Sequence, residues 1–442
     1  MVVACLLLVG CGGGGESSTP PPTSGVTPTP SPTPTPTPIP SPSPNVRVEI
    51  VPPFAALLPG GAATAGLVLA SDGNYYGAER LPGQNPCRPE IFPGRDCGVI
   101  VRVSPTGDKT ILHRFGLTAG DEFDPGPLVL GDDGAFYGAT NNGGAFGGGG
   151  TIFRITQSGS YTILHSFSGA NGDGAGPGFL TKGSDGNFYG TTASGGANRC
   201  PAIPSDGPNC GTVYRITPEG NVTILHSFGS TASDGVLPEA RLVEGEDGRL
   251  YGTTQIGGTN TCGTLPNSCG TLFSISKAGA LAILHSFGSA TGDGIVPRDL
   301  IRGPGDSIVG FTVAGGGSRC SVTSGCGTVF TFSAGSGVSV LYAFGQQNQL
   351  DGSGPSSLTL GTDGNFYGTT TSGGQFQCSS CGTVFRLTTA GRLTTLHSFG
   401  PVNTTPSSPT LISRSANGVL YGFMQFNTSF DGTPQYFRLT EL

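Results

Sequence analysis

The chain has 442 residues, of which 78 are Gly and 36 are Pro, so these two types make up about a quarter of it. Charged residues are only 11%, against about 25% in an ordinary soluble domain. A net charge of −7 with 21 Lys and Arg excludes a nucleic-acid binder, because no basic stripe exists to neutralise phosphates. Beyond the first residues, no apolar run approaches the roughly 20 residues of a membrane-spanning helix. These counts predict a Gly-rich, mostly β protein outside the cytosol.

The amino end predicts export. Residues 1–11 read MVVACLLLVGC, a short apolar run that ends in Leu8-Val9-Gly10-Cys11. These four residues resemble the lipobox of bacterial lipoproteins, in which the Cys becomes the lipidated first residue of the mature chain. The resemblance implies a lipid on Cys11 and a location at the outer membrane or cell surface. No Lys or Arg precedes the run, so an ordinary secretory signal or a start further upstream is the alternative.

Residues 12–45 predict a spacer. Four glycines are followed by a tract that alternates Pro with Thr or Ser, and twelve of the 36 prolines lie between Pro20 and Pro44. Such a tract has almost nothing to bury and favours polyproline II, which is semi-rigid. A disordered tail without a purpose is the alternative.

From about residue 60 the chain repeats itself. The dipeptide Tyr-Gly recurs at intervals of 52 to 62 residues, with Val309-Gly310 in the fifth place, at Tyr76, Tyr137, Tyr189, Tyr251, Tyr367 and Tyr421. Periods of this size are typical of propellers and solenoids. In the clearest unit, residues 357–399, an Asp-Gly turn, a variable loop and an Ala-Gly turn separate four predicted strands. Seven such units predict an all-β, seven-bladed β-propeller with four antiparallel strands per blade over residues 46–442. An open β-solenoid is the alternative.

The two ends of the repeat predict how the ring closes. The last unit stops at Tyr436–Thr440, its third strand, with two residues left. Val46–Val51 alternates apolar and polar residues, as a strand does. We expect this N-terminal strand to supply the missing fourth strand and to remove an exposed sheet edge.

The units read DGNFYGTT…GG…CGTVFRLT…G…LHSFG. This combination of short motifs resembles the GloVer-type tandem repeats found in bacterial surface proteins, over roughly residues 60–442. The resemblance implies an exported repeat protein that is tethered to the cell. It implies no enzymatic activity and no catalytic residue.

Ten cysteines form close pairs in the loop between the second and third predicted strands: Cys87/Cys97, Cys200/Cys210, Cys262/Cys269, Cys320/Cys326 and Cys378/Cys381. In an exported chain these pairs predict five local disulfides that staple the loops. The second unit has a Gly-rich stretch, residues 143–150, at the same place. The spacing of Cys378 and Cys381 also permits a redox or metal site, although no second pair or basic activator lies near.

The five histidines share one place in the repeat, two residues before a Phe: His113, His165, His226, His285 and His397. Tyr342 takes this place in the fifth unit. With one histidine per blade, neighbouring rings are too far apart to share a metal ion. We therefore expect each ring to pack beside its Phe with one nitrogen hydrogen-bonded.

The stapled loops and the connections between blades should emerge on one face of the ring. That face carries a repeated acid, at Asp124, Asp173, Asp234, Asp293 and Asp351, three to four residues before Pro127, Pro177, Pro238, Pro297 and Pro355. We expect these carboxylates near the channel mouth, where they cap their own turns or hold Ca²⁺. The loops of the same face carry four arginines that suit anion contacts: Arg88, Arg95, Arg199 and Arg319.

Nothing in the sequence resembles a nucleophile with its base. The few breaks in the repeat include Glu79-Arg80, where other units have Thr-Thr. The first hypothesis is an exported, lipid-anchored binding or envelope-scaffold module whose ligand, a glycan, peptide or protein, binds at the stapled face. The alternative is an exported propeller enzyme, a metal-assisted hydrolase or lyase at the channel mouth. No cofactor is predicted, apart from Ca²⁺ if the acids hold it.

Overall fold

The computed structural model describes only part of the chain. The described residues are 46–51, 62–63, 67–80, 97–106, 108–117, 123–170, 172–198, 200, 210–231, 233–262, 269–289, 292–316, 326–345, 350–376, 381–400, 409–414, 420–424 and 435–441. They all belong to one compact unit, residues 42–442. The predicted lipidation site, the spacer and the four arginines of the stapled loops lie outside the described residues.

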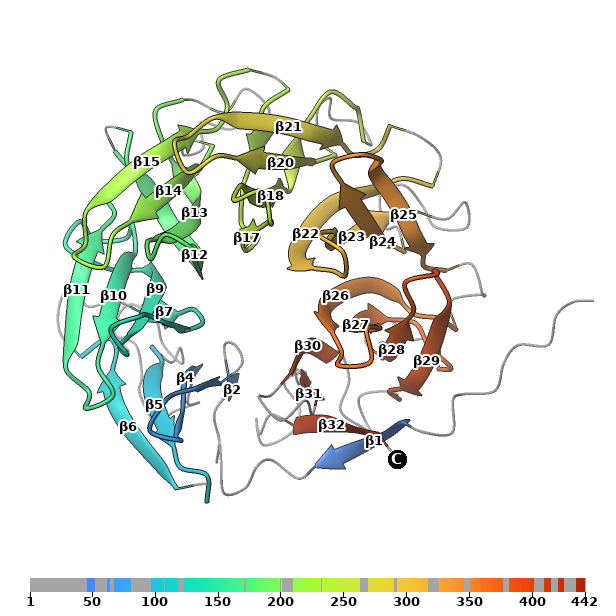
Figure 1. The fold of residues 1–442 in the computed structure, drawn as a ribbon, viewed down its shortest axis with the longest axis horizontal. Coiled ribbons are helices and arrows are strands. Elements are labelled where there is room, and N and C mark those ends of the chain that lie inside the picture. Colours follow the sequence, from blue (N-terminus) through green and yellow to red (C-terminus); the bar gives the residue numbers. More distant parts are fainter. Residues whose placement is uncertain are drawn as a thin grey trace, which may run out of the picture. The chain divides into compact units, whose positions relative to one another are not determined.

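All the regular secondary structure in the described residues is β-strand. The strands pair antiparallel, and their sheets follow the order of the repeat units along the chain (Figure 1). The first unit forms β2 (Ala62–Ala63), β3 (Val68–Leu69), β4 (Tyr75–Arg80), β5 (Val99–Val103) and β6 (Lys109–Arg114). The second forms β7 (Phe123–Pro125), β8 (Val129–Leu130), β9 (Phe136–Asn142), β10 (Thr151–Ile155) and β11 (Tyr161–Ser166). The third forms β12 (Gly174–Lys182), β13 (Phe188–Gly195), β14 (Thr212–Ile216) and β15 (Val222–Ser227).

The later units repeat this pattern. The fourth forms β16 (Gly235–Val236), β17 (Val243–Glu244), β18 (Leu250–Thr254), β19 (Ile256–Gly257), β20 (Thr271–Ile275) and β21 (Leu281–Ser286). The fifth forms β22 (Gly294–Arg302), β23 (Ile308–Gly315), β24 (Thr328–Ser333) and β25 (Gly337–Ala343). The sixth forms β26 (Ser353–Leu360), β27 (Phe366–Ser372), β28 (Thr383–Leu387) and β29 (Leu393–Ser398). The last forms β30 (Pro409–Arg414), β31 (Leu420–Met424) and β32 (Gln435–Glu441).

The N-terminal strand β1 (Val46–Val51) belongs to the sheet of the last unit, whose order is β1-β32-β31-β30. Its six residues pair antiparallel with β32, from Val46 opposite Glu441 to Val51 opposite Tyr436 (Figure 1). The prediction that residues 46–51 supply the fourth strand of the last sheet is therefore confirmed.

The repeated Tyr-Gly dipeptide lies on the second strand of a unit, where the Tyr bonds the preceding turn and the Gly makes room for the third strand. The Tyr189 hydroxyl donates to Asp185 of the Asp-Gly turn at 2.7 Å, and Tyr251 donates to Asp247 at 2.9 Å. Burial and the neighbouring Asp247 raise the pKa of Tyr251 to about 12. The Gly after the Tyr leaves room for an aromatic ring, because a Cβ at Gly252 would collide with the ring of Phe273.

Sheets of successive units pack face to face through buried aromatic rings. The ring centroids of Phe167 and Tyr214, from the second and third units, lie 5.1 Å apart. Equivalent pairs join the next units, at 5.0 to 5.3 Å: Phe228/Phe273, Phe287/Phe330 and Phe344/Phe385. The third strands are almost wholly buried, as expected for a strand covered on both sides. These observations define a β-propeller-like repeat fold.

The Cys-Gly step that precedes the third strand in five of the units lies at the contact between units. The Cys210 carbonyl accepts a hydrogen bond from the Leu237 amide of the next unit at 3.1 Å, and the Cys269 carbonyl accepts one from Val296 at 2.9 Å. Gly211 follows Cys210 with a φ of +93°, and a Cβ there would lie 2.7 Å from the Cδ of Pro238. Only Gly fits this position without strain, because it accepts positive φ and has no side chain to meet the next unit.

Candidate functional site

The disulfide prediction is confirmed at two places. Cys200 bonds Cys210, and Cys262 bonds Cys269. Cys97, Cys326 and Cys381 are also disulfide-bonded. Their predicted partners, Cys87, Cys320 and Cys378, lie outside the described residues. Because the second Cys of each pair precedes the Gly at the contact between units, these bonds anchor the loops close to that contact.

The predicted packing of the histidines is confirmed for all five rings, and the predicted hydrogen bond is shown for two of them. Each ring lies edge-on to its Phe, with centroid separations of 4.6 to 4.8 Å. The Nε2 atoms of His226 and His285 lie 3.1 Å from Oδ2 of Asp234 and Asp293. Burial lowers the pKa of His397. In the other units the acid that faces the histidine lies between its Phe and the next repeated Pro, whereas residues 400–408 contain no acid.

Four of the repeated acids cap their own turns, which is one of the two roles expected for them. Asp234 accepts hydrogen bonds from the Ser230 amide and hydroxyl at 3.2 and 3.0 Å, so it does cap its own turn. Asp173 and Asp293 do the same with Ser168 and Ser289, and Asp351 accepts from Gly345 and the Tyr342 hydroxyl. These four carboxylates lie against the end of the preceding unit, where they bond its fourth strand or the turn that follows it. That they approach a channel mouth as a ring stays a prediction.

Asp124 is not equivalent to these acids. In the register, Pro125 pairs with Thr140 as Pro177 pairs with Thr192, so the repeated Pro of the second unit is Pro125 and not Pro127. Asp124 therefore occupies the position directly before the Pro, where the backbone is left-handed with a φ of 71°. The same conformation recurs at Gly176, Leu237, Val296 and Gly354. Asp is one of the few side chains that tolerate it.

The His-Asp pairs make a prediction about pH. Burial alone would raise the pKa of Asp293, but hydrogen bonds from His285 and Ser289 outweigh it and hold the pKa below the ordinary 3.8. A depressed pKa in the folded state stabilises the fold above about pH 4, and this contribution is lost as the pH falls through the folded-state value. Asp293→Asn should therefore lower the free energy of unfolding by about 1.5–3 kcal/mol near neutral pH and by much less at about pH 3.

Urea unfolding of both proteins at the two pH values checks this. Asp132→Asn is the matched control, because that carboxylate is 75% exposed and should contribute little at either pH. An Asp293→Asn deficit that is the same at both pH values would contradict the role given to the ionised Asp293 carboxylate.

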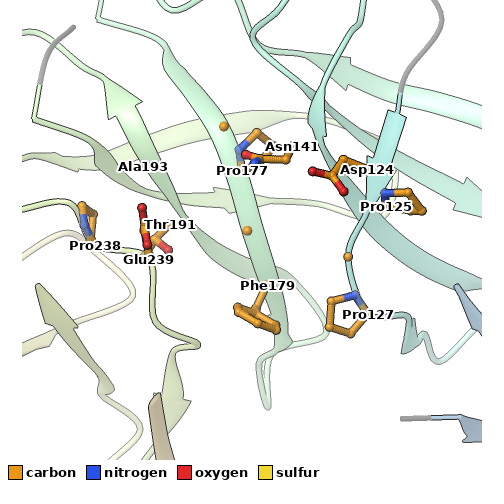
Figure 2. Close-up of a pocket in the computed structure, with 13 residues that line it drawn as sticks. Asp124, Pro125, Pro127, Asn141, Pro177, Phe179, Thr191, Ala193, Pro238 and Glu239 are labelled. Carbon is orange, nitrogen blue, oxygen red and sulfur yellow. The ribbon is translucent and has the colours of Figure 1, made fainter. Parts of the chain in front are cut away.

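A cavity of about 330 Å³ lies beside the first strands of the second, third and fourth units (Figure 2). The described residues of its wall are Asp124, Pro125, Gly126, Pro127, Asn141, Gly176, Pro177, Gly178, Phe179, Thr191, Ala193, Pro238 and Glu239. In the third unit the pairing of β12 with β13 shifts between Pro177 and Leu180. Such irregularities re-aim side chains and are frequent beside binding sites.

Two glycines leave the space that forms the cavity, because they lack the side chains that later units have at the same place. The residue directly after the repeated Pro is Glu239 in the fourth unit and Arg298 in the fifth, and these two side chains meet at 3.4 Å. Gly126 and Gly178 take this place in the second and third units. Neither has left-handed φ, and a Cβ on either would make only ordinary contacts of 3.6 to 3.7 Å. The backbone therefore does not require Gly at these two positions, but their lack of side chains creates the space.

Of the predicted site residues that the structure describes, the cavity contains only Asp124. Asn141, Phe179, Thr191 and Glu239 were not predicted. Glycine at the position after the Pro was the signal available in the sequence, but the Pro-Gly-Pro of residues 125–127 hid which Pro was the repeated one.

Glu79, where the first unit departs from the repeat, lies in the core and not at the cavity. Its side chain is fully buried and pairs with Lys109, at the place where the later units form pairs of buried threonines such as Thr192 and Thr212. Burial raises the pKa of Glu79, although Lys109 opposes the rise. Glu79 does not line the cavity.

Two other kinds of site are absent from the described residues. No group of three or more His, Cys, Asp or Glu side chains is placed to hold a metal ion among them. No helix long and apolar enough to cross a membrane occurs among them either.

The repeated antiparallel sheets and the cavity between units define a β-propeller-like repeat protein. The model of the Gloeobacter/Verrucomicrobia repeat matches residues 63–323 and 264–441. The chain therefore belongs to this repeat family, in agreement with the resemblance of its motifs. No curated protein is similar enough in sequence to count as a match.

Several solved structures are similar at low identity. A protein of unknown function from Dyadobacter fermentans is 12% identical, with 90% of this chain and 100% of that one covered and a TM-score of 0.45. The PQQ-bound aldose sugar dehydrogenase of Streptomyces coelicolor is 14% identical, with 90% and 99% covered and a TM-score of 0.41. A gluconolactonase of Xanthomonas campestris is 12% identical, with 66% and 79% covered and a TM-score of 0.36. At these TM-scores the similarities assign no activity to this chain.

Proposed function

We propose that this protein is an exported surface module that binds a ligand of the cell envelope or its surroundings, a glycan, peptide or protein. Its repeat sheets would form a closed seven-bladed β-propeller. The pairing of β1 with β32 and the aromatic contacts between successive units support a ring in which the first strands line a central channel.

The lipid anchor is the second part of the proposal. The lipobox-like residues before Cys11 and the Pro-rich spacer to residue 45 support it. Cys11→Ser should move the protein from the membrane fraction to the soluble fraction, because the acyl chains that hold it are no longer attached. Fractionation followed by mass spectrometry of the mature amino end checks this. A Cys11→Ser protein that stays with the membrane would contradict the anchor.

The observation that carries the binding function is the cavity made by Gly126 and Gly178. Recognition on a regular scaffold occurs where the repeat is broken, and here two successive units leave out a side chain that later units have. A volume of about 330 Å³ lies at the lower end of the range of ligand pockets, about 300–1,000 Å³. We therefore infer that the cavity receives one small molecule or one side chain of a larger ligand.

The test fills the cavity without disturbing the fold. Gly178→Gln places a long side chain where the backbone tolerates one, and it should abolish binding of any ligand that a panel of glycans and peptides identifies for the wild-type protein. Gly335→Gln is the control, because a Cβ at Gly335, in the turn between β24 and β25, meets nothing within 4 Å. Thermal unfolding should show that both variants fold. If Gly178→Gln binds every ligand as the wild type does, the cavity is not the site. Release of a cleaved product during the screen would instead identify an exported enzyme.

A further inference from the structure

We propose that Lys109 and Glu79 condense into an isopeptide bond, which joins the Lys Nζ atom to the Glu Cδ atom. This covalent modification belongs to the first unit and is independent of the proposed binding function. Neither residue lines the cavity.

The two side chains lie on one face of the first sheet. Glu79 on β4 is directly opposite Val99 on β5, and Lys109 on β6 is directly opposite Val103. Alternate residues of a strand share a face, and so do directly opposite residues of neighbouring strands. The Lys109 ammonium reaches across β5 and forms an ion pair with the Glu79 carboxylate. The contact therefore links the second strand of the sheet to the fourth.

Both members of the pair depart from the repeat. At the place of Glu79, the second to sixth units have a buried threonine: Thr140, Thr192, Thr254, Thr312 and Thr370. At the place of Lys109, the same units have an apolar or aromatic residue: Tyr161, Val222, Leu281, Val338 and Leu393. The first unit thus places two opposite charges where those units have none, and the two charges meet.

A third departure lies between them. Val101, opposite Gly77, stands where the other units have a large ring: Phe153, Tyr214, Phe273, Phe330, Phe385 and Phe437. Because Val is smaller than any of these rings, the long Lys109 side chain can pass over it to Glu79. Three positions on one face therefore differ from the repeat in a way that brings the amine and the carboxylate together.

Both groups are withdrawn from water. The Glu79 side chain is fully buried, and that of Lys109 is 12% exposed. Among the described residues, no donor reaches the Oε1 atom of Glu79. Burial raises the pKa of Glu79, although Lys109 opposes the rise. Since a buried ion pair costs free energy, transfer of a proton from the ammonium to the carboxylate is favoured. It leaves an uncharged amine, which is a nucleophile, beside a carboxylic acid.

The bond forms within this pair of groups. The Nζ atom of Lys109 attacks Cδ of Glu79, and one C–O bond of the carboxyl group breaks. One of the two protons left on the nitrogen departs with the hydroxyl as water, and the other stays on the amide. The reaction releases one water molecule and replaces two buried charges by a neutral group. The amide then joins β4 to β6 covalently.

Mass spectrometry of the reduced and unfolded full chain tests the inference. We expect the wild-type protein to have lost the mass of one water molecule. Trypsin should release residues 48–80 joined to residues 103–114, because it does not cleave after an acylated lysine. Asp-Gly steps such as Asp72-Gly73 also lose water when they cyclise, so fragmentation of the joined peptide has to place the bond at Lys109 and Glu79.

Two variants complete the experiment. Lys109→Arg keeps the positive charge and the hydrogen bond, but its guanidinium stays protonated and does not attack, so the joined peptide should be absent. Glu79→Thr combined with Lys109→Leu gives the first unit the residues of the fourth, and it supplies the same comparison if Lys109→Arg does not fold. Separate peptides 48–80 and 103–109 from the wild type, without the joined peptide, would overturn the inference. So would a loss of water that either folded variant retains in full.

Discussion

Gly270→Ala is expected to destabilise the fold by about 2–5 kcal/mol. Gly270 has a φ of +90°, and a left-handed backbone costs an L-residue about 1–2 kcal/mol. A Cβ at this position would also lie 2.5 Å from the Cδ of Pro297 in the next unit and 2.5 Å from the Thr254 carbonyl oxygen. Forcing a group into a packed contact adds about 1–3 kcal/mol. Denaturant unfolding monitored by circular dichroism measures the sum.

Two other glycines separate these causes. Gly248 has a φ of +72° with nothing within 4 Å of a Cβ, so Gly248→Ala should show only the backbone cost. Gly335→Ala should be neutral, since the position has neither left-handed φ nor a neighbour. The loss in free energy of unfolding should therefore be largest for Gly270→Ala, smaller for Gly248→Ala and close to zero for Gly335→Ala. If the first two variants were equally stable, Gly270 would not contact the next unit.

Deletion of residues 46–51 is expected to have the second large effect. The strand makes six cross-strand pairs with β32, each of which contributes about 0.2–1 kcal/mol, so about 1–6 kcal/mol should be lost. The deletion also exposes the edge of β32, and an unpaired edge is a template for association with other chains. We therefore expect a lower unfolding temperature together with concentration-dependent aggregation. Calorimetry and light scattering over a range of concentrations measure the two effects.

Deletion of residues 33–38 is the matched control. It removes the same number of residues from the Pro-rich spacer, outside the repeat, and should leave the unfolding temperature unchanged. An equal effect of the two deletions, or no effect of either, would show that β1 does not contribute to the last sheet in solution.

The sequence by itself determined most of the local structure. Asp-Gly turns, alternating strands and a fixed order of short motifs depend only on neighbouring residues, so the antiparallel strands of each unit could be predicted. The division of the first strand into two short pieces in the first, second and fourth units was not predicted. The pairing of β1 with β32 was also predictable, because the last unit lacked a strand and the amino end had one to spare. The disulfides between Cys200 and Cys210 and between Cys262 and Cys269 followed from close spacing in an exported chain.

Only the tertiary structure decided where the polar side chains point. Asp173 and Asp234 lie between the fourth strand of one unit and the first strand of the next. The sequence favoured a position of their carboxylates near the first strand. In the structure, the Ser168 amide donates to Asp173 and His226 lies within hydrogen-bond distance of Asp234, so both carboxylates face the end of the fourth strand. The cavity lies where two successive units have Gly126 and Gly178 at the place of larger residues in later units. The residues that meet there come from three units of the repeat. Their meeting depends on register and packing between sheets, which no local pattern in the sequence specifies.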